Sequence, residues 1–293
     1  GNEGLLQGHP FVKNVIVWDK QENKYSNMMD TISRIRENRY ERVINLQRFA
    51  STGIMTWRSG AVERVGFAKN PFAWSFTRKV EHEIADQNGK AIHEIERNHR
   101  LIDDWVQGKP SKPRLYPSNE DEQKVKGFIQ EPFVTMSPSS VWATKQLPLE
   151  KWQELIRGMD NEKVFLLGGP GDAMLCNSLA QPFNNVQVLA GKLSLLQSAA
   201  LMRHAKMNYV NDSAPLHLAS AMNAPVTAFF CSTIPAFGFG PLSDDSYIGE
   251  TEKNLECRPC GLHGKAECPL GHFDCGHSID VSKLRSVSNV AYE

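Results

Sequence analysis

The stretch NDSAPLHLASAMNAPVTAFF, residues 211–230, predicts a helix that is followed directly by a buried strand. Asp212 and Ser213 are residue types that accept hydrogen bonds from the first backbone N–H groups of a helix. Pro215 suits the first turn, because the N–H groups there have no partner within the helix. The apolar run after Pro215 predicts the helix, and the closing VTAFF predicts the strand. Such a helix start is either a well-capped terminus or a site built to receive an anion.

The rest of the second half repeats this alternation of strands and helices. Apolar runs predict strands at residues 133–137, 163–169, 186–191, 207–212 and 226–230, and helical patterns lie between them at 147–156, 172–180 and 194–205. Continuously apolar strands that alternate with helices are typical of a parallel sheet covered on both faces. The sequence therefore predicts an α/β fold whose ligands bind beyond the C-terminal ends of the strands.

The first half has a weaker pattern of its own. Residues 12–19 and 41–47 predict strands, and residues 92–106 predict a helix with apolar side chains at three- and four-residue spacing. Residues 109–118 carry three prolines without apolar periodicity and are typical of an interdomain linker. We therefore expect two domains, residues 1–118 with the linker and residues 119–293, a division that the length of 293 residues allows.

Composition excludes several classes of protein. The chain has 33 Lys and Arg against 33 Asp and Glu, which argues against a general nucleic-acid binder with its basic excess. No apolar run approaches the roughly 20 residues that span a bilayer. The chain begins with Gly1 rather than Met, so we expect further residues to precede it. Cys176 and Cys231 lie in apolar runs typical of a core, and the other cysteines crowd into residues 257–275, which indicates a reducing, cytoplasmic compartment rather than a disulfide scaffold.

Polar side chains follow several predicted strands at the points where the strands end. Ser139 and Ser140 follow the first strand of the second half and are suited to surround an oxyanion, with Lys145 supplying positive charge; the alternative is a polar loop with an exposed lysine. The sequence GGPGD follows the next strand, without the Lys-Ser/Thr pair of a P-loop. Its Asp172 either caps a helix or binds a ribose hydroxyl.

The third such loop is NDSAPLH, in which His217 is either a structural donor or a ligand contact. The C-terminal ends of parallel strands share one edge of a sheet, so we expect the three loops to lie together. Helix N-termini and a lysine at that edge suit a diphosphate. The sequence therefore predicts a nucleotide site there.

The cysteine-rich segment, residues 257–275, offers a possible metal site. Cys257, Cys260, Cys268 and Cys275 are four soft ligands that suit a tetrahedral, structural zinc ion. The alternative is a cysteine-rich loop that packs without metal.

The ordered set SVWATKQLPLEKW, LLGGPGD, NDSAPLHLASAMNAPVTAFF and CRPCGLHGKAECPLGHFDC resembles glycosyltransferase family 9, the bacterial ADP-heptose:lipopolysaccharide heptosyltransferases. The resemblance implies a GT-B fold, with two Rossmann-like domains facing across a cleft. Residues 1–118 would be an incomplete acceptor-side domain, and residues 119–293 the donor-nucleotide domain. The resemblance also implies a transfer that inverts the anomeric carbon and requires neither a metal ion nor another cofactor.

The resemblance assigns roles to particular residues. Ser139 or Ser140 matches a hydroxyl-bearing phosphate loop, Lys145 matches the lysine that neutralises the leaving diphosphate, and Asp172 falls near an acidic donor-binding position. The family's donor motif Asn-Asp-Ser/Thr-Gly-Pro-x-His is matched by Asp212, Ser213, Ala214, Pro215 and His217, with Ala214 in place of the usual Gly. Alanine there is costly if the backbone needs a positive φ or close contact with phosphate.

The start of the chain departs from the family pattern. Family members open with a strand and a Gly-Asp loop whose Asp resembles a general base, and this chain begins in a region resembling the part after that loop. We therefore name no catalytic base and expect that the N-terminal strand and loop are missing.

The implied partners are ADP-heptose and the lipopolysaccharide core or lipid A acceptor, met at the cytoplasmic face of the inner membrane through peripheral contact. Basic side chains of the first domain are candidates for meeting this anionic acceptor, or else form a solvated face: Arg58, Arg64, Lys69, Arg78 and Lys79. The alternatives are a GT-B enzyme that uses another nucleotide sugar, and a non-catalytic, zinc-stabilised nucleotide-binding module.

Overall fold

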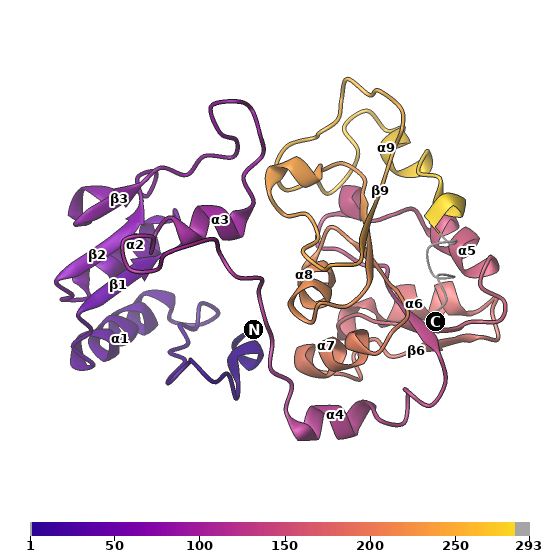
Figure 1. Ribbon diagram of the computed structural model, residues 1–293, viewed down its shortest axis with the longest axis horizontal. Coiled ribbons are helices and arrows are strands. Elements are labelled where there is room, and N and C mark those ends of the chain that lie inside the picture. The colour runs from indigo at the N-terminus through magenta and orange to yellow at the C-terminus, as the bar shows by residue number, and fades with distance from the viewer. Residues whose placement is uncertain (1, 285–293) are drawn as a thin grey trace. The chain divides into compact units, whose positions relative to one another are not determined.

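The computed structural model describes residues 2–284 and divides the chain into two compact units (Figure 1). The larger unit combines the chain up to Val12 with the chain from Lys112 onward, and the smaller unit is Lys13–Ser111. Each unit has its own parallel sheet and is described by itself.

The larger unit is built on a six-stranded parallel sheet with the order β6-β5-β4-β7-β8-β9. Its strands are β4 (Phe133–Ser137), β5 (Lys163–Leu166), β6 (Val186–Val188), β7 (Asn208–Asn211), β8 (Val226–Phe230) and β9 (Ser246–Glu250). In the register, Thr135 of β4 lies opposite Phe165 of β5 on one side and Asn208 of β7 on the other. The chain adds strands outward from β4 in one direction and then from β7 in the other, so the β4–β7 boundary is the topological switch point at which such sheets bind ligands.

Helices cover both faces of this sheet because successive strand residues point to opposite sides. The helices are α4 (Asn119–Val125), α5 (Leu149–Arg157), α6 (Ala173–Ala180), α7 (Leu195–Arg203), α8 (Ala214–Ala221) and α9 (Asp274–His277). Val134 of β4 packs in one buried cluster with Trp152 of α5 and Leu179 of α6. Its neighbour Phe133 packs in a second cluster with Leu201 of α7, on the other face.

The predicted α/β fold with a parallel sheet is thus confirmed, and each strand predicted between residues 133 and 230 is present within a few residues. Strand β9 was not predicted from the sequence. Its sequence SYIGE has only one apolar aliphatic side chain, and its pairing with β8 is what defines it as a strand. Short 3-10 turns complete the chain: η1 (Glu3–Leu6), η2 (Ala73–Ser75), η3 (Ala143–Lys145), η4 (Pro170–Asp172), η5 (Pro235–Phe237) and η6 (Val281–Leu284).

The smaller unit has a three-stranded parallel sheet with the order β1-β2-β3. Its elements are α1 (Lys24–Glu37), β1 (Arg42–Asn45), α2 (Ala50–Arg58), β2 (Glu63–Phe67), β3 (Arg78–Val80) and α3 (Glu94–His99). Val65 and Phe67 of β2 pack with Leu101 in its small core. Across the described residues of both units, helices are too short or too polar to cross a bilayer.

The strand predicted at residues 12–19 is wrong, because this stretch has no regular secondary structure. A strand requires a neighbouring strand to accept and donate its backbone hydrogen bonds. No strand of the described residues pairs with this stretch, and Val15 and Val17 remain exposed.

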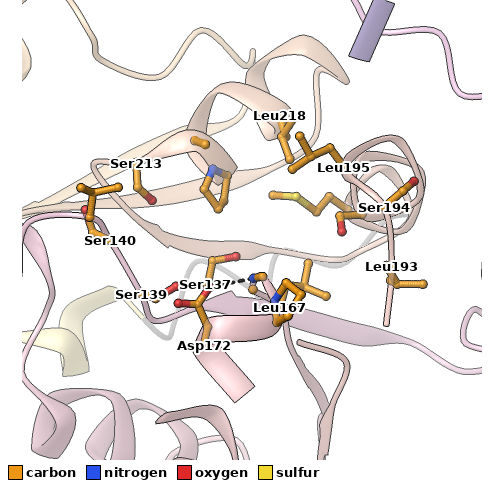
Figure 2. A pocket seen from close by; sticks show the side chains of 18 residues that line it. Ser137, Ser139, Ser140, Leu167, Asp172, Leu193, Ser194, Leu195, Ser213 and Leu218 are labelled. Carbon is orange, nitrogen blue, oxygen red and sulfur yellow. Dashed lines mark hydrogen bonds between the residues drawn. The ribbon is translucent and has the colours of Figure 1, made fainter. Parts of the chain in front are cut away.

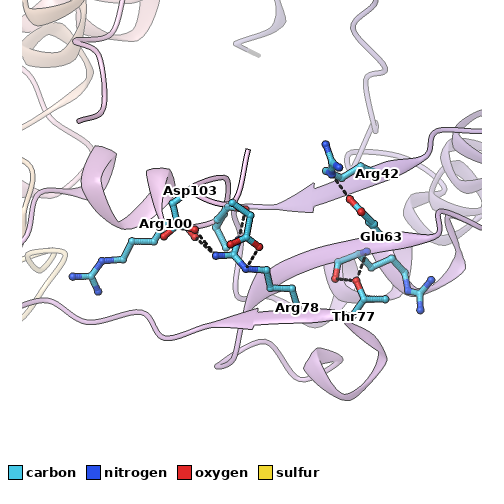
Figure 3. A network of polar contacts seen from close by, with 9 residues as sticks. Arg42, Glu63, Thr77, Arg78, Arg100 and Asp103 are labelled. Carbon is cyan, nitrogen blue, oxygen red and sulfur yellow. Dashed lines mark hydrogen bonds and ion pairs between the residues drawn. The ribbon is translucent and has the colours of Figure 1, made fainter. Parts of the chain in front are cut away.

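The helix predicted at residues 92–106 is also wrong in its length, because α3 ends at His99. The guanidinium group of Arg78 donates to the backbone carbonyls of Leu101 and Arg100 at 3.0 and 3.1 Å. These carbonyls would otherwise accept the helical N–H groups four residues later. Arg78 also forms ion pairs with Asp103 and Asp104, so the chain turns around this side chain (Figure 3).

Candidate functional site

A cavity of about 490 Å³ lies at the C-terminal ends of the strands in the larger unit, beside the switch point (Figure 2). A volume of this size is typical of small-molecule sites. The cavity is lined by residues at and after the ends of β4, β5 and β7 and by residues of α7 and α8 and the segment before α7: Ser137, Ser139, Ser140, Val141, Leu167, Gly168, Gly169, Pro170, Asp172, Leu193, Ser194, Leu195, Ser198, Met202, Ser213, Ala214, Pro215 and Leu218. The structure thus brings together the three loops that the sequence placed at one edge of the sheet.

The loop after β4 is shaped by Asn211, the last residue of β7. Its buried side-chain Nδ2 donates to the carbonyl of Pro138 at 2.8 Å, and its Oδ1 accepts from the backbone N–H of Leu147 at 2.9 Å. The amide therefore holds both ends of the segment that carries Ser139 and Ser140. Sequence reasoning gave Asn211 no role. The available signal was an amide side chain at the end of an apolar strand, where a buried polar group needs partners.

Asp172 closes the loop after β5. Its Oδ2 accepts from the backbone N–H of Gly169 at 2.7 Å. A Cβ at Gly168 would lie 2.8 Å from this carboxylate, so the loop requires glycine at this position. Asp172 occupies the N-cap position of α6, but its side chain makes no capping bond to that helix. Asp172 instead caps the start of the 3-10 turn η4, because its carboxylate accepts from the N–H of the N-cap residue Gly169. The predicted helix cap is thus present at η4 rather than at α6, and a ribose contact stays a prediction.

The start of α8 opens onto the cavity through Ser213, Ala214 and Pro215. Ser213 occupies the N-cap position, yet its side chain makes no capping hydrogen bond, and the carboxylate of Asp212 binds Lys145 and Thr233 instead. The expected cap by Asp212 or Ser213 is therefore wrong. Asp212 is turned toward other partners, and the Ser213 hydroxyl donates to the carbonyl of Asn211 at 3.4 Å. The N–H of Leu216 donates to the carbonyl of Ser213 at 3.1 Å and Pro215 has no N–H, so the N–H of Ala214 is the donor that the first turn offers to a ligand in the cavity.

Lys145 and Asp212 form a nearly buried ion pair, with 2.6 Å between Nζ and Oδ2 and side-chain exposures of 15% and 7%. The hydroxyl of Thr233 donates to the same Asp212 oxygen at 2.6 Å. Neither charged residue is among the cavity-lining residues, although both adjoin loops that line it. Burial requires such charges to be paired, and this pair joins the loop after β4 to the residue that precedes the start of α8.

His217 does not reach the cavity lining. Its ring lies edge-on to Phe239, with 6.3 Å between the ring centroids. The structure therefore gathers Ser139, Ser140, Asp172 and the Ser213–Pro215 segment around one cavity, and it places His217 in a separate aromatic contact.

The cysteine-rich segment lines a second, smaller cavity of about 350 Å³ through Cys257, Cys260 and Cys268. Cys275 is buried, and this burial raises the pKa of its thiol to about 11. Within residues 2–284, no three Cys, His, Asp or Glu side chains are arranged to hold a metal ion. The zinc hypothesis stays a prediction. Zinc analysis of protein purified without added metal tests it.

The two remaining cysteines belong to the core, as expected. Burial raises the pKa of the Cys176 thiol to about 12 and raises that of Cys231 further, so both stay protonated and unreactive.

The basic residues proposed to meet an acceptor differ in their contacts. Arg64 donates to the backbone carbonyl of Ser75 at 2.9 Å, and Arg78 holds the turn after α3. Lys69 donates to a backbone carbonyl at 3.3 Å, Arg58 lies 5.6 Å from the ring of Trp57, and Lys79 is exposed. Arg64 and Arg78 are thus engaged in holding the smaller unit together.

Comparison with known proteins finds one family. The family model of glycosyltransferase family 9 (heptosyltransferase) matches residues 28–269. Lipopolysaccharide heptosyltransferase 3 of Escherichia coli is 26% identical over 227 residues, which cover 73% of this chain and 66% of that protein.

Solved structures show the same fold. A family 9 glycosyltransferase from Veillonella parvula superposes with a TM-score of 0.73 at 19% identity, covering 84% of this chain and 73% of the other. The ADP-heptose lps heptosyltransferase II of E. coli superposes with a TM-score of 0.65 at 20% identity, covering 81% and 78%.

Proposed function

The chain belongs to glycosyltransferase family 9 and has its GT-B fold of two Rossmann-like domains, and on this premise we propose that it transfers a heptose from ADP-heptose to the lipopolysaccharide inner core. The observation that supports the donor most directly is the cavity at the switch point, onto which the uncapped start of α8 opens. Backbone N–H groups at a helix start, together with its partial positive charge, favour a diphosphate.

The cavity offers separate regions for the parts of the donor. The hydroxyls of Ser139, Ser140 and Ser213 lie with the start of α8 at the strand ends, where the diphosphate would bind. The apolar wall formed by Leu195 and Met202, among others, suits the flat face of a nucleobase. In this arrangement the carboxylate of Asp172 would accept a hydrogen bond from a ribose hydroxyl.

The reaction requires stabilisation of the leaving group. The acceptor hydroxyl oxygen forms a bond to the anomeric carbon and loses its proton to a general base, for which no residue is assigned. The bond from that carbon to the diphosphate oxygen breaks at the same time, and the electron pair of the broken bond leaves with ADP. Negative charge therefore grows on the diphosphate in the transition state. The ammonium group of Lys145 would stabilise this charge, because a charge contact that strengthens during bond breaking lowers the barrier.

The acceptor in this proposal is anionic and lipid-linked, so the enzyme would work at the cytoplasmic face of the inner membrane through peripheral contact. The exposed side chain of Lys79, together with Arg58 and Lys69, remains available to meet phosphate or carboxylate groups of the acceptor.

A transfer assay tests the proposal. The protein, supplied with heptose-deficient lipopolysaccharide, should release ADP from ADP-heptose and add one heptose to the acceptor, as seen by mass spectrometry. If the protein released a nucleoside diphosphate only from a different nucleotide sugar, it would be a GT-B transferase with another donor. Binding of ADP without any transfer would instead indicate a nucleotide-binding module.

A further inference from the structure

The cysteine-rich segment is hydrogen-bonded to the loop that carries Lys145. Thr144, the residue before Lys145, is buried, and its backbone N–H donates to the carbonyl of Lys265 at 3.1 Å. In return, the Thr144 hydroxyl accepts from the backbone N–H of Lys265 at 2.8 Å. This two-way contact fixes the backbone immediately next to Lys145.

The same segment lies directly against the side chain of Lys145. Gly264 has φ +76, and a Cβ built on it would lie 2.9 Å from Cγ of Lys145 and 3.2 Å from the hydroxyl of Thr144. Such a distance is shorter than real Cβ contacts, so only glycine allows this approach. The backbone at Gly264 therefore lies directly against the methylene groups of Lys145.

A second set of contacts reaches the partner of the lysine. Thr233, which donates to Asp212, has its own carbonyl bound by Nη2 of Arg258 at 2.9 Å. The carbonyl of Ser232 accepts from the backbone N–H of Cys260 at 2.9 Å, and the hydroxyl of Ser232 donates to Thr144 at 3.0 Å. The cysteine-rich segment thus holds the chain on both sides of the Lys145–Asp212 pair.

We propose that the cysteine-rich segment is a positioning element that holds the ammonium group of Lys145 where the diphosphate binds. Lys265 and Gly264 act on the lysine, and Arg258 acts on Asp212 through Thr233. The inference rests on the proposed role of Lys145 in leaving-group stabilisation. A misplacement of about 1 Å at a catalytic group costs about a hundredfold in rate, which gives a distant loop a measurable effect on turnover.

Two glycines of the segment provide a matched test. Gly264 and Gly271 have φ +76 and +74, but a Cβ at Gly271 meets no atom within 4 Å. Both substitutions, Gly264→Ala and Gly271→Ala, impose the same backbone strain, and only the first displaces Lys145. We expect Gly264→Ala to lower kcat at least tenfold relative to Gly271→Ala, with the KM for the donor changed less than threefold and similar melting temperatures.

A second pair of variants covers the case in which Gly264→Ala fails to fold. Thr144→Val removes the hydroxyl that accepts from Lys265, whereas Thr144→Ser keeps it. We expect kcat to fall in Thr144→Val and to be largely restored in Thr144→Ser. Equal kcat values for the two Thr144 variants, or for the two glycine variants, would overturn the inference.

A readout that needs no substrate separates this inference from the proposed function. In the free protein, an amine-acetylating reagent should modify Lys145 slowly, because the ammonium group is held against Asp212. We expect faster modification of Lys145 in Gly264→Ala than in Gly271→Ala, measured by peptide mass spectrometry with the other lysines as internal standards. Equal modification rates would overturn the positioning role. Unchanged turnover in Lys145→Ala would instead overturn the role of Lys145 in the proposed function.

Discussion

The two units hold their charged side chains in different ways. In the larger unit, Lys145 and Asp212 are a single, nearly buried pair beside a cavity at the switch point. In the smaller unit, Arg78 binds two carbonyls and two aspartates, Asp103 and Asp104, whose side chains are 51% and 56% exposed. Exposed ion pairs contribute little energy each, whereas a nearly buried pair is costly to break, because the loss of one partner leaves the other charge buried and unpaired. The location of a charge relative to the strand ends, rather than the number of charges, indicates the site.

The largest effect, a loss of turnover, is expected when the buried Lys145–Asp212 pair is broken. Lys145→Ala should lower kcat about a hundredfold at saturating ADP-heptose and weaken ADP binding much less, because the contact strengthens as the bond breaks. The measurement is steady-state turnover alongside ADP calorimetry. Lys151→Ala is the control, since Lys151 pairs with Glu154 on α5, away from the cavity lining, and should retain turnover within about twofold. Full activity in Lys145→Ala would mean that the buried Lys145–Asp212 pair, like the contacts of Arg78, has no role in turnover.

A smaller effect is expected where a charge is added at the cavity. Ser213→Asp should weaken ADP affinity about tenfold or more, because the new carboxylate would lie where the diphosphate binds. Ser213→Asn is the matched control, since Asn is a comparable N-cap residue without charge. Titration calorimetry should give weaker binding for Asp than for Asn, with similar melting temperatures. Equal ADP affinities in the two variants would mean that this helix start is structural only.

The third prediction concerns the exposed network of the smaller unit. Arg78→Ala should lower the free energy of unfolding by about 1–2 kcal/mol, because the carbonyls of Arg100 and Leu101 lose their donor. Lys79→Ala, its exposed neighbour, should change it by less than about 0.5 kcal/mol. Urea unfolding measures both. ADP affinity should be unchanged in both variants; a loss of affinity in Arg78→Ala would contradict the assignment of this network to structure.

The smallest expected effect is the contribution of His82, in the smaller unit, to the pH dependence of the free energy of unfolding. Burial, followed by the nearby charge of Arg48, lowers the pKa of His82 below its ordinary value. The folded protein therefore binds fewer protons at His82 than the unfolded chain does as the pH falls through about 6.5. The free energy of unfolding should decrease as the pH is lowered from 7 toward 5, and His82→Gln should show a shallower decrease. Identical pH profiles for the two proteins would show that His82 does not contribute.

Much of the larger unit could be predicted from the sequence. Continuous apolar runs specify buried strands, and parallel strands bring their C-terminal ends to one edge, so chain order alone predicts that Ser139, Asp172 and Ser213 lie together. The cap expected at α8 was wrong, because Asp212 has a stronger partner in Lys145, which lies far from it in the sequence.

In the smaller unit, local patterns were less informative. The apolar spacing of residues 92–106 is helical, but Arg78 takes the carbonyls that a longer helix would need. Residues 12–19 contain a β-branched apolar run typical of a strand, but a strand also requires a partner. Both outcomes depend on groups outside the segment, which local periodicity does not contain.

The sequence by itself determined the alternation of strands and helices, the parallel sheet of the larger unit and the loops that meet at its edge, because hydrophobic periodicity and chain order specify these features. Only the tertiary structure decided that Asn211 holds the loop after β4, that Lys145 pairs with Asp212, and that the cysteine-rich segment binds Thr144 and Thr233 beside this pair. These contacts join side chains far apart in the chain, and their geometry exists only once the sheet has brought the strand ends together.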